Sequence, residues 1–261
     1  MWKLADIEVK SRLILGTAQY SSPEILCQSI VSAGAEVVTA SLRRQHPSTQ
    51  GGQSFWDIVK RCQVRILPNT AHCRSAKEAI LTAHLARELF QTNWIKLEVI
   101  GDEASLAPDP FELVEAARTL CREGFEVFPY TTEDVVTAER LLHAGCRILM
   151  PWASPIGTGQ GLIRPESLSQ LRSRFPQATL IVDAGIGRPS HAAQAMEMGF
   201  DAVLLNSAVA LASNSAQMAL AFAQSIESGR RAFEAGLMPK RSCAMASTPI
   251  DGHPFATGMS S

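Results

Sequence analysis

The sequence predicts an α/β protein whose strands close into a single (β/α)8 TIM barrel. Short runs of aliphatic and β-branched residues alternate with helical segments along the 261 residues, as expected for βαβ units around a parallel sheet. Glycine-rich loops follow the predicted sixth and seventh strands, whereas no Gly-x-Gly-x-x-Gly turn follows the first. This length is also common for a one-domain barrel. An open doubly wound sheet is the alternative, because strand number alone does not prove closure.

The predicted elements follow one another as short strands and longer helices. The strands cover residues 12–15, 36–40, 65–67, 94–99, 126–130, 147–150, 179–182 and 202–205. Helical periodicity marks residues 75–90, 110–122, 132–144, 165–175, 190–198 and 215–235. The weakest element is the helix between the second and third strands, because residues 45–54 read as a polar loop.

Several helix ends carry capping signals. Ser75 and Glu78 form a capping-box pattern, and Pro110 and Pro165 suit a first helical turn. Glycines stand where left-handed residues close helices before the next strand, namely Gly124, Gly145 and Gly199. These signals support the alternation of strand and helix.

Composition indicates one large core and excludes some classes of partner. Apolar residues make up 46% of the chain and the net charge is −1, with no basic patch for a nucleic acid. We expect residues 1–236 to form the barrel and catalytic domain. Residues 237–261, rich in Ser, Pro and Gly, are expected to form an extended or mobile tail.

The cysteines and the apolar runs indicate a cytoplasmic protein. Six cysteines occur without a Cys-x-x-Cys pair, and no histidine lies at zinc-ligand spacing. We therefore expect reduced thiols, no metal site and no cofactor. No apolar run approaches the ~18 residues of a membrane span, and no long apolar segment resembles a signal peptide.

Two opposite charges interrupt the predicted fourth strand, Trp-Ile-Lys-Leu-Glu-Val-Ile. In a strand, Lys96 and Glu98 point to one face. Burying such a pair is costly, so it asks for a chemical reason. A desolvated lysine can have a lowered pKa and form a Schiff base, with Glu98 shuttling protons. A structural ion pair explains residue type and spacing about equally well.

The predicted seventh strand ends in Asp183-Ala184-Gly185, followed by Ile-Gly. Asp183 is expected to face the barrel mouth, and the small turn before a helix suits a phosphate. The simpler interpretation is a glycine turn that Asp183 caps. Loops after strands seven and eight often make the phosphate site of such barrels, which favours phosphate.

Two further segments are candidates for the same site. Asn206 and Ser207 end the predicted eighth strand and suit a phosphate or sugar contact, or a helix cap. The loop 151–161 holds Gly157, where backbone can approach an anion closely; a flexible linker is the alternative. Two pairs rank lower, Arg43-Arg44 as a phosphate or partner contact and Asn69-Thr70 as a hydroxyl contact or a turn.

Together these segments resemble the bacterial thiazole synthase family. The matching stretches run in order over nearly the whole chain: 11–17, 67–71, 95–101, 106–110, 129–131, 154–161, 182–187, 201–207 and 246–249. The resemblance implies a (β/α)8 barrel that makes the thiazole phosphate moiety of thiamine. Its implied substrates are 1-deoxy-D-xylulose 5-phosphate, dehydroglycine (2-iminoacetate) and the thiocarboxylate of a ubiquitin-like sulfur-carrier protein.

The resemblance also implies residue roles and a homo-oligomer, with a tetramer favoured. Lys96 matches the imine-forming lysine, after which an Amadori-type rearrangement follows, and Glu98 and Asp183 match the acid–base positions. The positions that match sugar-phosphate contacts are Gly157, Ala184, Gly185, Asn206 and Ser207.

The chain departs from the family pattern near the first two strands. Ala18 and Gln19 replace a usual Gly-Lys, Ser41-Leu42 replaces Ala-Val, and His72 stands where glycine is frequent. These changes bear on partner docking or substrate entry, and Trp152 could narrow the mouth. Two other functions fit the residues alone: a lysine-dependent sugar-phosphate aldolase and a non-catalytic phosphate-binding barrel.

Overall fold

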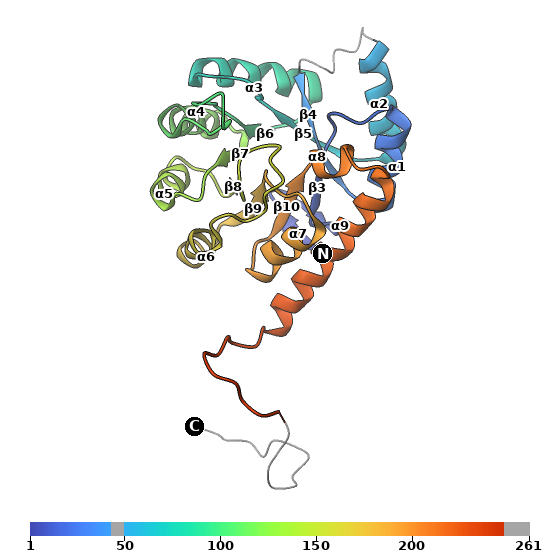
Figure 1. Ribbon diagram of the computed structural model, residues 1–261. Coiled ribbons are helices and arrows are strands. Elements are labelled where there is room, and N and C mark those ends of the chain that lie inside the picture. The colour runs from blue at the N-terminus through green and yellow to red at the C-terminus, as the bar shows by residue number, and fades with distance from the viewer. Residues whose placement is uncertain (43–49, 248–261) are drawn as a thin grey trace.

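The computed structural model describes residues 1–42 and 50–247, and its central feature is a closed parallel barrel (Figure 1). The barrel strands are β3 (Leu13–Gly16), β4 (Val37–Ser41), β5 (Arg65–Asn69), β6 (Trp94–Leu97), β7 (Glu126–Thr131), β8 (Ile148–Pro151), β9 (Thr179–Asp183) and β10 (Ala202–Leu205). They are ordered β10-β3-β4-β5-β6-β7-β8-β9 around the ring. Closure comes from parallel pairing of β10 with both β3 and β9. The predicted (β/α)8 barrel is confirmed, and the open sheet is excluded.

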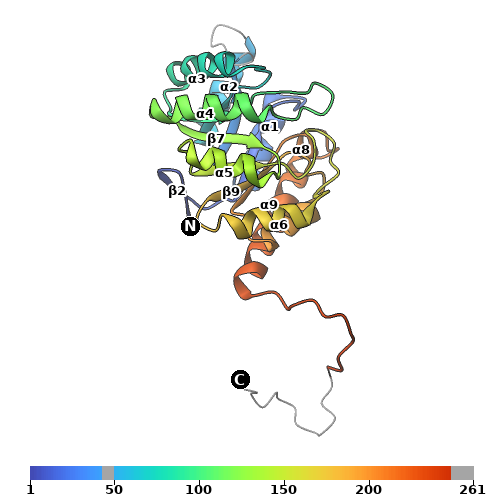
Figure 2. The ribbon, with the colours of Figure 1, turned by 90° about the vertical axis from the view of Figure 1, so that its left-hand side faces the viewer.

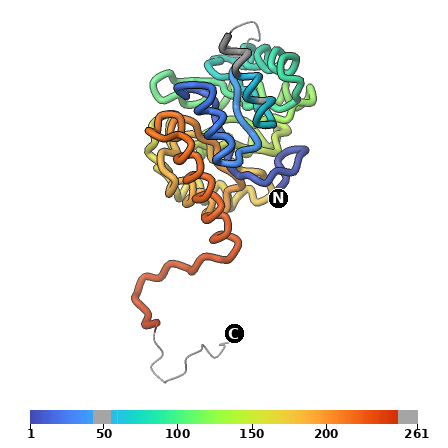
Figure 3. Tube along the Cα trace, turned by 90° about the vertical axis from the view of Figure 1, so that its right-hand side faces the viewer, coloured from blue at the N-terminus to red at the C-terminus, as the bar shows by residue number. Residues whose placement is uncertain are grey.

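Helices form the outer layer of the molecule. They are α1 (Pro23–Ala33), α2 (Gln50–Cys62), α3 (Ala76–Phe90), α4 (Pro110–Arg122), α5 (Val135–His143), α6 (Pro165–Arg174), α7 (Pro189–Glu197), α8 (Ser207–Ala210) and α9 (Ser215–Ala235). Figure 2 shows α3, α4, α5 and α6 one below another on one flank. On another flank α9 packs against both α1 and α7, which brings the last helix beside the first (Figure 3).

Strand alternation divides the core into two apolar clusters. Ile95, Leu97 and Val99 belong to the larger cluster, which packs strands against helices. Trp94 belongs to a smaller cluster with residues of the other barrel strands, including Phe128. This is the two-residue period of a strand, with alternate side chains inside and outside the barrel.

A short antiparallel hairpin, which the sequence patterns did not predict, covers one end of the barrel. It consists of β1 (Trp2–Leu4) and β2 (Ile7–Val9). Leu4 and Val9 are buried in the inner cluster. The Trp94 indole at the start of β6 donates to Asp6 Oδ1 at 2.8 Å. The hairpin therefore closes the N-terminal end of the barrel, opposite the ends where β6 and β9 place Lys96 and Asp183.

Most helix boundaries follow the capping signals. The Ser75 hydroxyl accepts from Glu78 N at 3.3 Å, while the Glu78 carboxylate accepts from Arg74 N at 2.8 Å instead of closing on Ser75 itself. Pro110 and Pro165 begin α4 and α6. The predicted closing glycines all have positive φ: Gly124 81°, Gly145 110° and Gly199 86°.

Three parts of the predicted pattern need correction. Residues 45–54 are not all loop, because α2 begins at Gln50; residues 43–49 lie outside the described part of the chain. Helix α5 begins at Val135, later than residue 132, because Asp134 caps it by accepting from Thr137 N at 2.7 Å. Helix α1 follows the first barrel strand, as the eight predicted strand–helix units require, whereas the short helix α8 was not predicted.

The chain leaves the barrel after α9. Residues 237–247 are exposed and contain no helix or strand, and they lead away from the barrel (Figure 1). Residues 248–261 of the predicted tail lie outside the described residues. In the described part of the chain, no helix is long and apolar enough to cross a membrane.

Candidate active site

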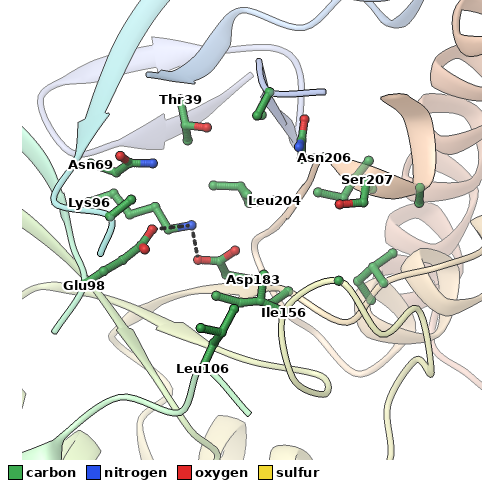
Figure 4. Close-up of a pocket in the computed structure, with 18 of the residues that line it drawn as sticks. Thr39, Asn69, Lys96, Glu98, Leu106, Ile156, Asp183, Leu204, Asn206 and Ser207 are labelled. Carbon is green, nitrogen blue, oxygen red and sulfur yellow. Dashed lines mark ion pairs between the residues drawn. The ribbon is translucent and has the colours of Figure 1, made fainter. Parts of the chain in front are cut away.

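A cavity of about 490 Å³ opens at the C-terminal ends of the barrel strands. Its wall includes seven of the eight predicted site residues: Lys96, Glu98, Gly157, Asp183, Ala184, Asn206 and Ser207. Gly185 is buried directly behind this wall. The residues come from elements far apart in the sequence, and closure of the barrel brings them together (Figure 4).

The centre of the cavity is a lysine between two carboxylates. Lys96 Nζ lies 2.7 Å from Asp183 Oδ2 and 3.3 Å from Glu98 Oε1. Lys96 and Glu98 are each 6% exposed and Asp183 is 2% exposed. Figure 4 shows all three side chains converging on one point. The predicted pairing of Lys96 with Glu98 is confirmed, and Asp183 joins it as the nearer partner.

The two carboxylates of Asp183 and Glu98 outnumber the single ammonium of Lys96, and their charges shift the pKa values of this cluster. Burial alone lowers the pKa of Lys96, but Asp183 and Glu98 outweigh it and raise the pKa above its ordinary 10.5. Desolvation, which can lower the pKa of a buried lysine, is therefore opposed here by the two neighbouring carboxylates. Burial, with a further contribution from Glu98, raises the pKa of Asp183 above its ordinary 3.8 despite Lys96. The resting lysine is an ammonium, and Asp183 is the nearest base.

Thr70 fixes the backbone of Glu98 just beyond the end of β6. Its hydroxyl donates to Glu98 O and accepts from Glu98 N, both at 2.8 Å. Thr70 N also donates to Lys96 O at 3.1 Å. One buried threonine thus continues the β5–β6 ladder where the main-chain pairing stops, and it holds Glu98 at the cavity.

Replacing Thr70 with valine should lower the free energy of unfolding by about 1–3 kcal/mol, because buried groups of Glu98 lose their partner. We also expect slower turnover, since Glu98 is held less firmly. Urea unfolding and steady-state kinetics measure the two effects. The matched control is Thr131→Val, because the buried Thr131 hydroxyl has no hydrogen-bond partner among the described residues. Equal losses in both variants would contradict the role of Thr70.

The predicted phosphate side of the cavity is built from two loops in backbone contact. Ala153 N donates to Ala184 O at 3.2 Å, and Gly161 N donates to Gly185 O at 2.8 Å. Ala184 and Gly185 both have positive φ, 79° and 77°. A Cβ on Gly185 would lie 2.5 Å from Ser154 N. The glycine therefore permits a close approach that no other residue allows.

Gly185→Ala should lower the free energy of unfolding by about 2–4 kcal/mol, combining overpacking with backbone strain. Gly157→Ala is the matched control: its φ is 78°, but an added Cβ meets nothing within 4 Å. The control should therefore lose only about 1 kcal/mol. Urea unfolding of both variants measures the difference, which isolates the contact with Ser154. Similar losses of unfolding free energy in the two variants would mean that the positive φ alone, and not the contact with Ser154, requires glycine at position 185.

Asn206 reaches the cavity from the end of β10. A Cβ on Gly16 would lie 2.7 Å from Asn206 Cγ, so the asparagine packs flat against the β3 backbone. Asn206 Oδ1 is buried and has no hydrogen-bond partner among the described residues. Ser207 beside it donates to Gln19 Oε1 at 3.2 Å. Asn206 therefore lies on the predicted phosphate side, where its amide N–H groups, and not the unpaired oxygen, could donate to a phosphate.

Most of the residues near the first two strands that differ from the family pattern lie on or beside the cavity. Ala18, Ser41 and His72 line it. Gln19 is exposed with φ 70°, and its amide contacts Ser207. Leu42 packs against the outer core. Arg43 and Arg44 lie outside the described residues, so their predicted contacts stay predictions.

Trp152 lies outside the cavity wall and therefore does not line the mouth as expected. Its indole donates to Glu133 Oε2 at 2.5 Å, and Arg164 donates to Glu133 Oε1 at 2.7 Å. The Trp152 ring meets the edge of Tyr130, with centroids 6.4 Å apart. Tyr130 in turn lies 5.8 Å below Lys96 Nζ and donates to Leu106 O at 3.3 Å. Trp152 thus packs behind the site.

Sequence reasoning missed Tyr130, Leu106 and the role of Thr70. Each acts through a contact with a residue more than 20 positions away, which no local spacing reveals. The only available signal was position, because Thr70 and Tyr130 both stand where predicted strands end.

The fold and the cavity together define a barrel enzyme. Its centre is a buried lysine beside two carboxylates, and its rim is made of glycine-containing loops. Comparison with known proteins identifies the family. The family model described as thiazole biosynthesis protein ThiG matches residues 3–249.

Curated relatives agree with the family model. A thiazole synthase of Coxiella burnetii (strain Dugway 5J108-111) is 57% identical over 255 residues, covering 98% of each chain. A thiazole synthase of Brucella abortus (strain S19) is 57% identical over 246 residues, covering 94% of this chain and 96% of the relative. The chain belongs to the ThiG family, and its activity is that of a thiazole synthase in thiamine biosynthesis.

Solved structures resemble the barrel fold of this chain. The BexX/CysO complex of Amycolatopsis orientalis matches with a TM-score of 0.81 and 30% identity, covering 92% of this chain and 98% of that chain. Thiamine phosphate pyrophosphorylase from Pyrococcus furiosus matches with a TM-score of 0.57 and 10% identity, covering 83% of this chain and 95% of that chain. At this identity the match shows a shared fold alone.

Proposed function

We propose that the protein forms the thiazole phosphate of thiamine through an imine at Lys96. The substrates are 1-deoxy-D-xylulose 5-phosphate, dehydroglycine and sulfur from a thiocarboxylated carrier protein. The observation that carries the proposal is the burial of Lys96 between two carboxylates inside a cavity large enough for a sugar phosphate. The family assignment favours this function over an aldolase or a non-catalytic barrel.

In the first step Lys96 must lose a proton before it attacks the ketone. Asp183 Oδ2, 2.7 Å away, accepts that proton, and its raised pKa brings the two groups closer in basicity. The amine adds to the ketone carbon C2 to give a carbinolamine. Loss of water, with a carboxylic acid protonating the departing hydroxyl, gives the iminium.

The rearrangement then moves the carbonyl by one carbon. A carboxylate removes the proton from C3, and the electron pair of that bond forms the enaminol while neutralising the iminium. Reprotonation at C2 and loss of the C3 hydroxyl proton give a C3 ketone, with Lys96 bound to C2 as an amine. Glu98 and Asp183 both lie beside Lys96 Nζ, so either proton position is within their reach.

We assign the phosphate of the sugar to the opposite side of the cavity. Gly157, Ala184, Asn206 and Ser207 line that side, and Gly185 shapes it from behind. Asn206 and Ser207 stand at the start of α8, whose first N–H groups no side chain of the described residues caps. Lys96 and the phosphate contacts thus bind the two ends of one substrate.

We propose that the sulfur donor is a separate carrier protein that docks at the cavity mouth. The support is that BexX, a structural relative, was solved in complex with CysO. A cytoplasmic location, self-association into a tetramer and the boundary between barrel (1–236) and tail (237–261) stay predictions.

Reconstitution tests the proposed function. The protein is mixed with the sugar phosphate, thiocarboxylated carrier and dehydroglycine, and thiazole phosphate is detected by mass spectrometry. Borohydride with the sugar phosphate alone should add one stable mass at Lys96. If the sugar binds but no adduct forms at Lys96, the imine mechanism is wrong.

A further inference from the structure

Asn69 is a cavity residue to which none of the steps above gives a role. It ends β5 and lines the cavity. Its Oδ1 is buried, yet it has no hydrogen-bond partner among the described residues. Figure 4 shows the amide nitrogen directed toward the open cavity, between Thr39 and Lys96.

Strand register places Asn69 beside the covalent residue. Asn69 and Lys96 are direct partners across β5 and β6. Neighbouring strands lie about 4.8 Å apart, and paired residues point to the same face. The amide therefore stands next to the lysine stem, on the opposite side of Lys96 from Asp183 in Figure 4.

The unpaired oxygen argues against a structural role for Asn69. A buried acceptor without a donor destabilises a folded protein, and an apolar side chain of the same shape avoids that cost. Thr70, the next residue, shows the contrast, because its hydroxyl makes two hydrogen bonds to Glu98. The described residues therefore do not use the amide as an acceptor, and the N–H that Figure 4 directs into the cavity is the part of the amide that a ligand would meet.

We propose that Asn69 donates a hydrogen bond to the oxygen on C3 of the bound sugar, next to the carbon that Lys96 attacks. This inference rests on the proposed function. Once Lys96 is bonded to C2, the C3 oxygen must lie near the lysine, where Asn69 Nδ2 faces the cavity. The amide would thus be a catalytic residue, since it touches the reacting atoms.

The chemistry of the rearrangement explains why a neutral donor suits this position. The C3 oxygen begins as a hydroxyl and ends as a ketone, and both accept a hydrogen bond from an amide N–H. Negative charge develops on this oxygen as the enaminol loses its hydroxyl proton, and a placed donor stabilises that charge. A carboxylate there would repel it, and two carboxylates already stand beside Lys96.

Borodeuteride separates the two species that Lys96 would carry. Reduction of the imine places deuterium on C2, whereas reduction of the rearranged ketone places it on C3. Both adducts have the same mass, and fragmentation of the Lys96 peptide locates the label. Captured after a short fixed incubation with 1-deoxy-D-xylulose 5-phosphate, the full-length protein should show both.

In Asn69→Leu the ratio of C3 to C2 label should fall at least tenfold, the scale of losing one oxyanion donor. Asn69→Ser, which places a hydroxyl donor at the same position, should restore part of the lost ratio of C3 to C2 label. The control Thr39→Val removes a hydroxyl from the neighbouring cavity wall, to which no role is given, and should keep the wild-type ratio. The melting temperature of Asn69→Leu should equal or exceed that of the wild type, because the lost oxygen has no hydrogen-bond partner among the described residues.

The possible failures are distinguishable. An unchanged label ratio in Asn69→Leu, with a normal adduct at Lys96, overturns the role of Asn69 and leaves the proposed function standing. A lowered melting temperature together with an unchanged ratio shows a structural role instead. Absence of any Lys96 adduct in the wild type overturns the imine mechanism and this inference with it.

Discussion

Replacing Lys96 with methionine is expected to abolish turnover, with a loss of at least about 10⁴-fold, because no other lysine among the described residues lines the cavity to form the imine. Borohydride should then add no mass with the sugar phosphate. Detection of thiazole phosphate in the reconstituted reaction and intact-protein mass spectrometry measure the two effects. Persistent turnover would show that Lys96 is not the covalent residue.

The same variant should also change how stability depends on pH. Without the ammonium, two buried carboxylates face each other, which costs about 3–5 kcal/mol at neutral pH. The folded-state pKa of Asp183, already raised, rises further above its unfolded value. The contribution of protonated Asp183 to the free energy of unfolding is then fully present below the unfolded-state pKa. It is lost as pH rises through the folded-state pKa. Urea unfolding should show Lys96→Met closer to wild type near pH 5 than near pH 7.5.

The second large effect is expected for Asp183→Asn. The amide keeps the shape of the side chain but cannot accept the Lys96 proton, so turnover should fall by about 10²–10⁴-fold. The phosphate contacts are untouched, so the sugar should still bind. Rapid borohydride quenching measures the rate of imine formation, and equilibrium titration measures binding.

The pH profile gives an independent test of Asp183. In the wild type, imine formation should slow as pH falls through the raised pKa of Asp183, above the ordinary 3.8, because the protonated acid is no longer a base. This acidic limb should disappear in Asp183→Asn. An unchanged limb and unchanged turnover would assign the proton transfer to Glu98.

The parts of the site that the sequence predicted are those governed by local periodicity. Lys96 and Glu98 share a face because strand side chains alternate, and Asp183 marks the point where an apolar strand ends. Gly157 and Gly185 stood out because their loops are rich in glycine. Contacts across strands were not, because the 2.7 Å approach of Asp183 to Lys96 depends on barrel closure.

The remaining errors have physical causes. Sequence reasoning considered desolvation as the influence on the pKa of Lys96, but it could not weigh the two carboxylates that raise this pKa in the folded protein. The hairpin of β1 and β2 consists of two three-residue strands, too short to show a period. Asn69 and Thr70 are adjacent in sequence, yet one faces the cavity and the other clamps Glu98, a distinction that only coordinates reveal.

Closure of the ring by β10 and β3 has a consequence for biosynthesis of the chain. Val203 pairs with Leu13, and α9 packs against α1, so the contacts that complete the barrel join residues almost 200 positions apart. Contacts of such high contact order form slowly. During translation, β3 must wait with an unpaired edge until β10 leaves the ribosome, a state prone to strand-to-strand aggregation. Truncation before residue 202 should therefore yield an insoluble chain instead of a smaller, stable barrel.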